Sequence, residues 1–366
     1  MAQLNTRLAC CLVALLACGV ALPASAASKK QALAPGTARK PSTAQKSLLY
    51  AQRPDAMDAA QTIALRHGLD PAWVRRTLAA ARHVPQVTRW VLPAPAGTAK
   101  NWQNYRSRFI DPVRIQAGVE FWKLHADTLA RAEREYGVPA AVIVGIIGVE
   151  TIYGRDTGTF RVLDVLATLS FDFPAAHPRA EQRRGFFLDE LGQFLLLASR
   201  MGADPMGFKG SYAGAMGLPQ FMPSSWLRYA VDFDGDGRTD LFKSGADAIG
   251  SAANYFREHG WQTGMATHYE VQFDNARLDL EALLAPDILP TFSAASMVAK
   301  GLVLDPVAMQ HNGKLALVEL QNGAAAPSFV VGTDNFYAIT RYNWSSYYAM
   351  AVIELAREVA SARSRL

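Results

Sequence analysis

One carboxylate, Glu150, stands in a setting that favours acid–base chemistry. It is the only charged residue between Glu135 and Arg155, and it ends the apolar run 138–150, Val-Pro-Ala-Ala-Val-Ile-Val-Gly-Ile-Ile-Gly-Val-Glu. A helix this apolar is buried on all sides, and burial disfavours an ionised carboxylate. A glutamic acid that stays protonated near neutral pH can donate a proton to a leaving oxygen. The alternative is a helix-end glutamate paired with a basic group such as Arg155.

A loop rich in small residues is the second place where side chains could meet a ligand. Residues 210–225 read Gly-Ser-Tyr-Ala-Gly-Ala-Met-Gly-Leu-Pro-Gln-Phe-Met-Pro-Ser-Ser. The glycines let the backbone approach a ligand closely, and Ser211 and Gln220 can hydrogen-bond to hydroxyl and acetamido groups. We interpret the segment as a binding loop, with a plain turn as the alternative.

An acidic loop at residues 232–247 has the pattern of a structural calcium site. Acids at its first, third and fifth positions, a glycine at the sixth and a carbonyl at the seventh match the start of a calcium loop. The twelfth position is Lys243 where the common form has a bidentate glutamate, and the next acid comes only at position 16. The predicted ligands are Asp232, Asp234, Asp236, Arg238 through its carbonyl, and Asp247. A solvated acidic turn without a metal is the alternative.

Motifs for several other chemistries are missing from the sequence. It contains no G-x-S-x-G, H-E-x-x-H, G-x-x-x-x-G-K or G-x-G-x-x-G pattern, and its seven histidines are scattered. A serine hydrolase, a zinc peptidase, an NTPase and a dinucleotide enzyme are therefore disfavoured. No organic cofactor is expected.

The elements that must position these residues are mostly helical. Apolar residues recur at three- and four-residue spacings from 121 to 136, where Gly137 predicts a helix stop and Pro139 suits the start of the next helix. Similar patterns cover 185–200, 246–259 and 346–361. Between 268 and 335 apolar and polar residues alternate, broken by Gly, Pro and Asn, which is typical of short strands. The predicted fold class is α+β, predominantly helical, with a small β-rich subdomain late in the chain.

Composition limits the partners. The chain has 366 residues with 37 Lys plus Arg against 32 Asp plus Glu, and six of the basic residues but none of the acids fall in the first 46 positions. The remainder is near neutral, which argues against nucleic acid as a partner because phosphate binding relies on a cationic face. We expect a monomer with no transmembrane segment in the mature chain.

The first 26 residues have the pattern of a signal peptide. Arg7 precedes an apolar stretch from Leu8 to Leu22, and Ala24-Ser25-Ala26 forms an A-x-A cleavage site. All three cysteines lie inside this segment, so a mature chain cut after Ala26 has none. The expected location is the periplasm. An alternative is a lipoprotein anchored through Cys18, since Leu15-Leu16-Ala17-Cys18 loosely resembles a lipobox.

Residues 27–47 follow as a basic linker. They include five basic residues, no acid and few apolar side chains, a composition typical of disorder. The linker could hold an anionic surface loosely, or serve only as a solubilising tether.

Two segments together, GVETIYG and GAMGLPQFMPSSW, resemble the lytic murein transglycosylases, specifically the membrane-bound lytic transglycosylase B family, glycoside hydrolase family 103. The resemblance extends over most of the mature chain. Its motifs, in order, are the segment 105–110, IVGIIGVETIYG, VLDVLATLSFDFP, GSYAGAMGLPQFMPSSW, VDFDGDG, DAIGSAANYFREHGW and RYNWSSYYAMAV.

The resemblance implies a lysozyme-like catalytic core and an activity on peptidoglycan glycan strands. In the family, a single carboxylate cleaves the bond between N-acetylmuramic acid and N-acetylglucosamine without water, and the muramoyl 6-hydroxyl closes a 1,6-anhydro ring. That carboxylate falls on Glu150, which would act first as acid and then as base. The sugar-contacting residues fall on Tyr105, Ser211, Gln220, Tyr255, Tyr342, Asn343 and Tyr348. A lengthened calcium loop is also implied.

The expected organisation combines these observations. Residues 48–262 would form a helical N-terminal region and the catalytic core, 263–336 the β-rich subdomain, and 337–366 a C-terminal helix that completes the cleft. Two other functions stay open. One is a two-carboxylate muramidase in which Asp156, Asp164 or Asp172 partners Glu150, and the other is an inactive wall-binding protein.

Overall fold

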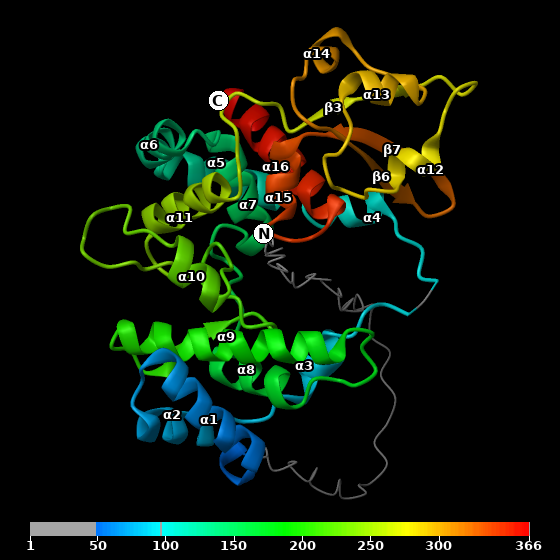
Figure 1. Cartoon of the computed structure of the whole chain (residues 1–366). Helices are drawn as coiled ribbons and strands as arrows, with labels where there is room; N and C mark the ends of the chain where they lie inside the picture. The colour runs from blue at the N-terminus through cyan, green and yellow to red at the C-terminus, as the bar shows by residue number, and fades with distance from the viewer. Residues whose placement is uncertain (1–48, 96, 366) are drawn as a thin grey trace, which may run out of the picture.

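The computed structural model describes residues 49–95 and 97–365, so the predicted signal peptide 1–26 and linker 27–47 lie outside the described residues. Within these ranges helices dominate (Figure 1), which confirms the predicted class. In chain order the helices are α1 (Pro54–His67), α2 (Pro71–Ala79), α3 (Pro85–Trp90), α4 (Trp102–Arg106), α5 (Pro112–Leu124), α6 (Ala126–Tyr136), α7 (Ala140–Thr151), α8 (Val162–Phe171), α9 (Ala180–Arg200), α10 (Pro223–Tyr229), α11 (Gly245–Glu258), α12 (Leu280–Leu284), α13 (Ala294–Ala299), α14 (Pro306–Met309), α15 (Asp334–Thr340) and α16 (Ser346–Ser364), with 3₁₀ turns η1 (Tyr50–Gln52) and η2 (Pro205–Gly207).

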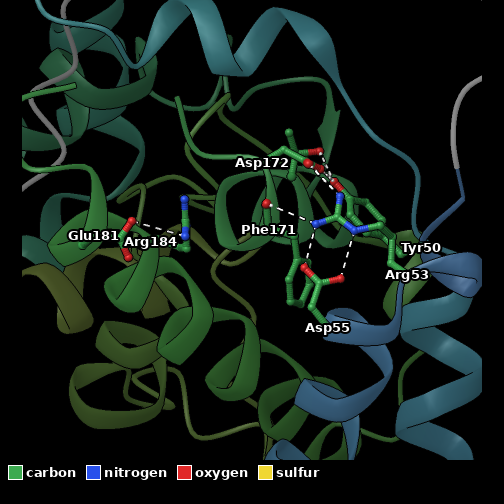
Figure 2. Close-up of polar contacts among 8 residues, drawn as sticks. Tyr50, Arg53, Asp55, Phe171, Asp172, Glu181 and Arg184 are labelled. Atoms are coloured by element: carbon green, nitrogen blue, oxygen red, sulfur yellow. Dashed lines mark hydrogen bonds and ion pairs between the residues drawn. The ribbon is translucent and has the colours of Figure 1, made fainter. Parts of the chain in front are cut away.

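The N-terminal helices pack on α8 and α9, the lower group in Figure 1. Arg53 fastens this packing, because its guanidinium contacts Asp172 at 2.8 Å and Asp55 at 2.6 Å (Figure 2). The Tyr50 hydroxyl donates to the other oxygen of the Asp172 carboxylate. The chain before α1 is thereby tied to the end of α8.

The central packing pair is α7 and α16, which are far apart in the sequence. All residues of α7 from Val142 to Val149 are buried, as the apolar run predicts. Gly145 permits the close crossing, since a Cβ there would lie 2.6 Å from the backbone oxygen of Val352. Helix α16 thus backs the helix that carries Glu150.

The predicted helix pattern from 121 to 136 is divided in the structure. Residue His125 has non-helical angles and ends α5 before α6 begins, while its ring packs against Phe121 at 4.6 Å. The stop at Gly137 is confirmed by its left-handed conformation, and Pro139 is the N-cap of α7.

The predicted strands between 268 and 335 are confirmed. Strand β3 (His268–Glu270) pairs antiparallel with β7 (Ala325–Gly332), and β7 pairs with β6 (Ala316–Asn322). Strands β4 (Gln272–Phe273) and β5 (Leu302–Val303) form a second pair. A small separate core beneath them includes Leu283, Met297 and Val331, so α12 and α13 belong to the same subdomain. Its boundaries at 263 and 336 remain a prediction.

One further strand pair lies beside the site. Strand β1 (Phe160–Arg161) pairs antiparallel with β2 (Lys209–Gly210). Gly158 makes this approach possible, because a Cβ there would lie 2.2 Å from the oxygen of Gly210.

None of the helices in residues 49–365 combines the length and the apolar character that crossing a membrane requires.

Candidate active site

Helix α7 delivers Glu150 to a cleft at its C-terminal end. The helix stops at Thr151, and the next three residues, Ile152, Tyr153 and Gly154, all have left-handed backbone angles, with φ of 50°, 57° and 88°. Such strain in non-glycine residues persists only where neighbours hold it. The Thr151 hydroxyl supplies one such hold, since it donates to the oxygen of Leu218 at 2.9 Å and accepts from the Gly154 amide at 3.1 Å.

The Glu150 carboxyl has the properties of a general acid. Burial raises its pKa from 4.5 to about 7, although a hydrogen bond from the Tyr348 hydroxyl to its Oε1 acts in the opposite direction. The expected alternative partner, Arg155, instead contacts Glu120 at 3.3 Å. A substantial fraction of Glu150 is therefore protonated at neutral pH, as its apolar surroundings predict.

The hydrogen bond from Tyr348 to Glu150 should affect how kcat/KM depends on pH. A hydrogen bond to the ionised carboxylate lowers its pKa, so Tyr348→Phe should raise the Glu150 pKa further, by about one to two units for a charge-assisted bond. Because the protonated acid is the reactive form, the alkaline limb of kcat/KM should move to higher pH by that amount. Tyr347→Phe is the control, since its hydroxyl donates to Gln321 instead. If the alkaline limb of kcat/KM stays at the same pH in Tyr348→Phe, then the ionisation of Glu150 does not determine that limb.

The cleft around Glu150 has a volume of about 340 Å³. Six of the eight residues predicted for the site line it, and these are Tyr105, Glu150, Ser211, Gln220, Asn343 and Tyr348. These side chains come from α4, α7, the loop before α10, the segment before α16 and the first turn of α16, so most of the predicted set converges from distant parts of the chain.

Backbone contacts restrict what the binding loop can offer. The Gln220 side-chain nitrogen donates to the oxygens of Thr157 at 3.2 Å and Gly217 at 2.9 Å. Its left-handed backbone, with φ of 49°, is held by the same contacts. The amide oxygen of Gln220 is left as an acceptor. Ser211 is the converse case, because its hydroxyl oxygen accepts from the Ala213 and Ala215 amides and its proton is left to donate.

Asn343 holds a buried amide oxygen that has no hydrogen-bond partner among the described residues. The residue is 4% exposed. An unpaired buried polar atom is costly in a folded protein, and at a ligand site it marks a group kept for the ligand. Asn343 is therefore poised to orient a polar group bound in the cleft.

Two of the predicted tyrosines lie behind the cleft lining. The Tyr255 hydroxyl donates to the Arg341 oxygen at 2.7 Å, and the Tyr342 hydroxyl donates to the oxygen of Pro219. The Tyr342 ring stacks on Tyr348 with centroids 6.5 Å apart. Neither is among the residues that line the 340 Å³ cleft, so the structure supports a positioning role for them and leaves sugar contact a prediction.

Several lining residues were absent from the prediction. Arg114 is 8% exposed, and its Nε lacks a partner in the described part of the chain, while another of its nitrogens donates to the Arg108 oxygen. Arg114 lies in the first turn of α5, and nothing in the local sequence distinguishes it from an arginine on the protein surface. Phe109, Phe160 and Tyr212 also line the cleft and supply aromatic surface.

A second carboxylate could act with Glu150 only if it is available. Asp164 is held by Arg161 at 2.7 Å and accepts from the Arg82 amide, and Asp172 is held by Arg53 and Tyr50 (Figure 2). Neither lines the cleft. Asp156 does line it, and it is exposed. Of the three alternatives, only Asp156 shares the cleft with Glu150.

Glu190 is a buried acid that the sequence did not point out. Its two oxygens accept from the Ser224 hydroxyl at 2.5 Å and the Ser224 amide at 2.9 Å. Burial raises its pKa to about 7. This carboxyl on α9 holds the first turn of α10, directly after the binding loop, and so supports the position of Gln220.

The acidic loop brings three of its predicted ligands together. Carboxylate oxygens of Asp232, Asp234 and Asp247 lie within 4.8 Å of one another, while Asp236 is outside this group. Asp247 is 1% exposed, and its two oxygens accept from the Phe233 amide at 2.8 Å and the Asp240 amide at 2.7 Å. The acid at position 16 thus lies beside the acids at positions 1 and 3, and such a set of hard oxygen donors fits calcium.

Fold and site together place one partly buried carboxyl at the C-terminal end of an apolar helix, inside a cleft. The chain belongs to the transglycosylase SLT domain family, whose model matches residues 52–357. This confirms the resemblance seen in the sequence and the predicted enzyme class, a lytic transglycosylase.

Individual relatives agree. The chain is 40% identical over 330 residues to membrane-bound lytic murein transglycosylase B of Escherichia coli strain K12, covering 86% of this chain and 85% of the relative. It is similar to the crystal structure of soluble lytic transglycosylase SltB1 from Pseudomonas aeruginosa, with 42% identity, a TM-score of 0.76, and coverage of 85% of this chain and 100% of the other. The Escherichia coli lytic transglycosylase Slt35 in complex with calcium is also similar, with 38% identity, a TM-score of 0.73, and coverage of 89% and 100%.

Proposed function

We propose that the protein cleaves the β-1,4 bond between N-acetylmuramic acid and N-acetylglucosamine in peptidoglycan and leaves 1,6-anhydromuramoyl ends, acting as a monomer. The observation that carries the proposal is the Glu150 carboxyl, whose pKa of about 7 lets one group give and then take a proton at neutral pH. Glu190 has a similarly raised pKa, but it does not line the cleft, so Glu150 alone of these two acids combines the raised pKa with a place beside a bound substrate.

Two proton transfers complete the reaction. Protonated Glu150 donates to the glycosidic oxygen while the bond from that oxygen to the muramoyl C1 breaks. The muramoyl 6-hydroxyl oxygen then bonds to C1, and the Glu150 carboxylate takes the proton of that hydroxyl. The carboxyl is restored, no water is consumed, and no second protein carboxylate is required.

The substrate acetamido group would stabilise the positive charge that develops at C1. Asn343 would hydrogen-bond to this group, since its buried amide has an unpaired oxygen. The Gln220 amide oxygen would accept a hydrogen bond from a substrate N–H or hydroxyl, because the side-chain nitrogen is committed to backbone oxygens. Tyr105 and Tyr348 would supply apolar faces to the sugar rings.

Products distinguish this mechanism from a two-carboxylate muramidase, in which carboxyl groups about 5 to 9.5 Å apart cut with water. We expect Asp156→Asn to keep releasing anhydro products at a rate within about tenfold of wild type, since general acid–base roles contribute 10²-fold or more. Mass spectrometry of digested sacculi measures both product types. Reducing ends in the wild-type digest that disappear in Asp156→Asn would instead assign hydrolysis to Glu150 and Asp156.

We infer that loop 232–247 binds calcium in a structural role. Three carboxylates within 4.8 Å repel one another unless a cation compensates their charge, and oxygen donors are the ligands that calcium prefers. Asp232, Asp234 and Asp247 would supply the carboxylates, and Asp236 and the Arg238 carbonyl would complete the set. The metal would order the loop and take no part in the chemistry.

We also propose that the protein is exported and cut after Ala26, which yields a periplasmic enzyme. The five basic residues of the linker would give a weak attachment to anionic surfaces, since such contacts fade beyond about 8 Å at physiological salt. High-salt fractionation should therefore release the protein, and the intact mass should begin at Ala27. A membrane pellet that carries a lipid-modified Cys18 would overturn this proposal, because combined acyl chains hold regardless of salt.

A further inference from the structure

A second and larger cavity, of about 1140 Å³, adjoins the Glu150 cleft. It lies between the C-terminal end of α9, helix α10 and the loop 237–243. Gly158 lines both cavities, so the two meet at the turn that precedes β1. We call this second cavity the α9–α10 groove.

The walls of the α9–α10 groove carry an excess of positive charge. Four exposed cationic residues line it, and these are Arg200, Lys209, Arg238 and Lys243. Across residues 49–95 and 97–365, none of the four forms an ion pair.

Two acids, Asp204 and Asp240, line the same groove, and both carboxylates accept hydrogen bonds from backbone amides. Asp204 accepts from the Met206 amide at 2.9 Å. Asp240 accepts from the Phe242 and Lys243 amides at 2.9 and 3.1 Å. Four cations against two acids leave the groove with a net charge of +2, whereas the chain outside its first 46 residues is near neutral. The groove is therefore a local concentration of positive charge that favours an anionic ligand.

Aromatic residues form the floor of the groove. The rings of Phe208, Trp226 and Phe242 pack together, with Phe242 lying 6.0 Å from Phe208 and 5.3 Å from Trp226 between centroids. An extended chain with both apolar and anionic side groups matches an aromatic floor between cationic walls. A glycan strand without its peptides carries one lactyl carboxylate on each muramoyl residue but no apolar side group, so it would leave the aromatic floor unused.

We propose that the α9–α10 groove binds the anionic stem peptide attached to a muramoyl residue held near Glu150. This inference rests on the proposed function, because it requires peptidoglycan as the substrate. The peptide carboxylates would face Arg200, Lys209, Arg238 and Lys243, and its apolar parts would lie on the aromatic floor. Peptide binding would then distinguish peptide-bearing strands from strands whose peptides have been removed.

The test compares two substrates with one double variant. Arg200→Gln with Lys209→Gln removes two of the cations and leaves the loop 232–247 untouched. Kinetics are measured on glycan strands with intact stem peptides and on the same strands stripped by an amidase. We expect KM on the peptide-bearing strands to rise about three- to tenfold, in keeping with the modest strength of two exposed ion pairs, and KM on stripped strands to stay within twofold.

Arg75→Gln with Arg76→Gln is the matched control, because both arginines are exposed on α2 and the change in charge is the same. This control variant should leave KM unchanged on both the peptide-bearing and the stripped strands. Wild-type preference for peptide-bearing strands should also shrink as salt is raised, since exposed charges are screened.

The outcomes separate this inference from the proposed function. Equal KM changes on the two substrates, or none on either, would overturn the peptide groove while anhydro products continued to support the transglycosylase. A larger KM change on stripped strands would assign the groove to the glycan itself. Absence of anhydro products from both substrates would contradict the proposed function.

Discussion

Glu150→Gln should reduce release of 1,6-anhydro products at least about a thousandfold, because the amide cannot pass a proton and this one residue performs both transfers. The variant should keep its fold, since glutamine has the same shape and can still accept the Tyr348 hydrogen bond. It should also retain substrate binding, because Ser211, Gln220 and Asn343 are unchanged. Product release by mass spectrometry and binding of isolated glycan strands measure the two effects separately.

Glu120→Gln is the control for this variant. Glu120 is exposed and contacts Arg155, so the same change of side chain there should leave turnover near the wild-type value. Substantial anhydro-product release by Glu150→Gln would remove Glu150 from the mechanism. Loss of turnover together with a lowered melting temperature would point to a failure of folding, which circular dichroism would detect.

Calcium should raise the melting temperature, and Asp247→Ala should abolish that response. A ligand that binds only the folded state stabilises it by about 2.7 kcal/mol at one hundred times its dissociation constant, which corresponds to roughly 5–10 °C in a domain of 150–250 residues and somewhat less here. Asp247→Ala should also destabilise the metal-free protein by about 2–5 kcal/mol, because two backbone amides lose their acceptor.

Thermal unfolding in chelator and in millimolar calcium measures both parts of this prediction. Asp232→Ala should lose the calcium response, and Asp58→Ala, which removes an exposed acid on α1, should keep it. Equal melting temperatures of the wild type in the two conditions would contradict a calcium site. A calcium response that survives in Asp247→Ala would show that another group closes the loop.

The parts of the site that follow from local sequence could be predicted. Glu150 stands out because one charge at the end of an apolar run is a local pattern, and the burial that raises its pKa follows from the same run. The loop of Ser211 and Gln220 is equally local, since glycines and turn formers mark it. The strands between 268 and 335 follow from alternation within a few residues.

Features that depend on contacts between distant segments could not be predicted. The Tyr348 hydroxyl meets Glu150 across 198 positions of the chain, and no spacing rule reaches so far. The commitment of the Gln220 nitrogen to Thr157 requires the turn before β1 to lie beside the loop. Whether Asp247 lies near Asp232 and Asp234 depends on where α11 begins. The spacing of the acids in the sequence does not determine that.

Helix α16 has a consequence for when the acid of the site comes into being. It packs along α7, and its first turn carries the hydroxyl that contacts Glu150. Until these two helices pack, the Glu150 carboxyl is open to water and keeps an ordinary pKa, because the burial that raises it is missing. Docking of α16 on α7 is therefore the folding step that turns an ordinary glutamate into the acid of the enzyme.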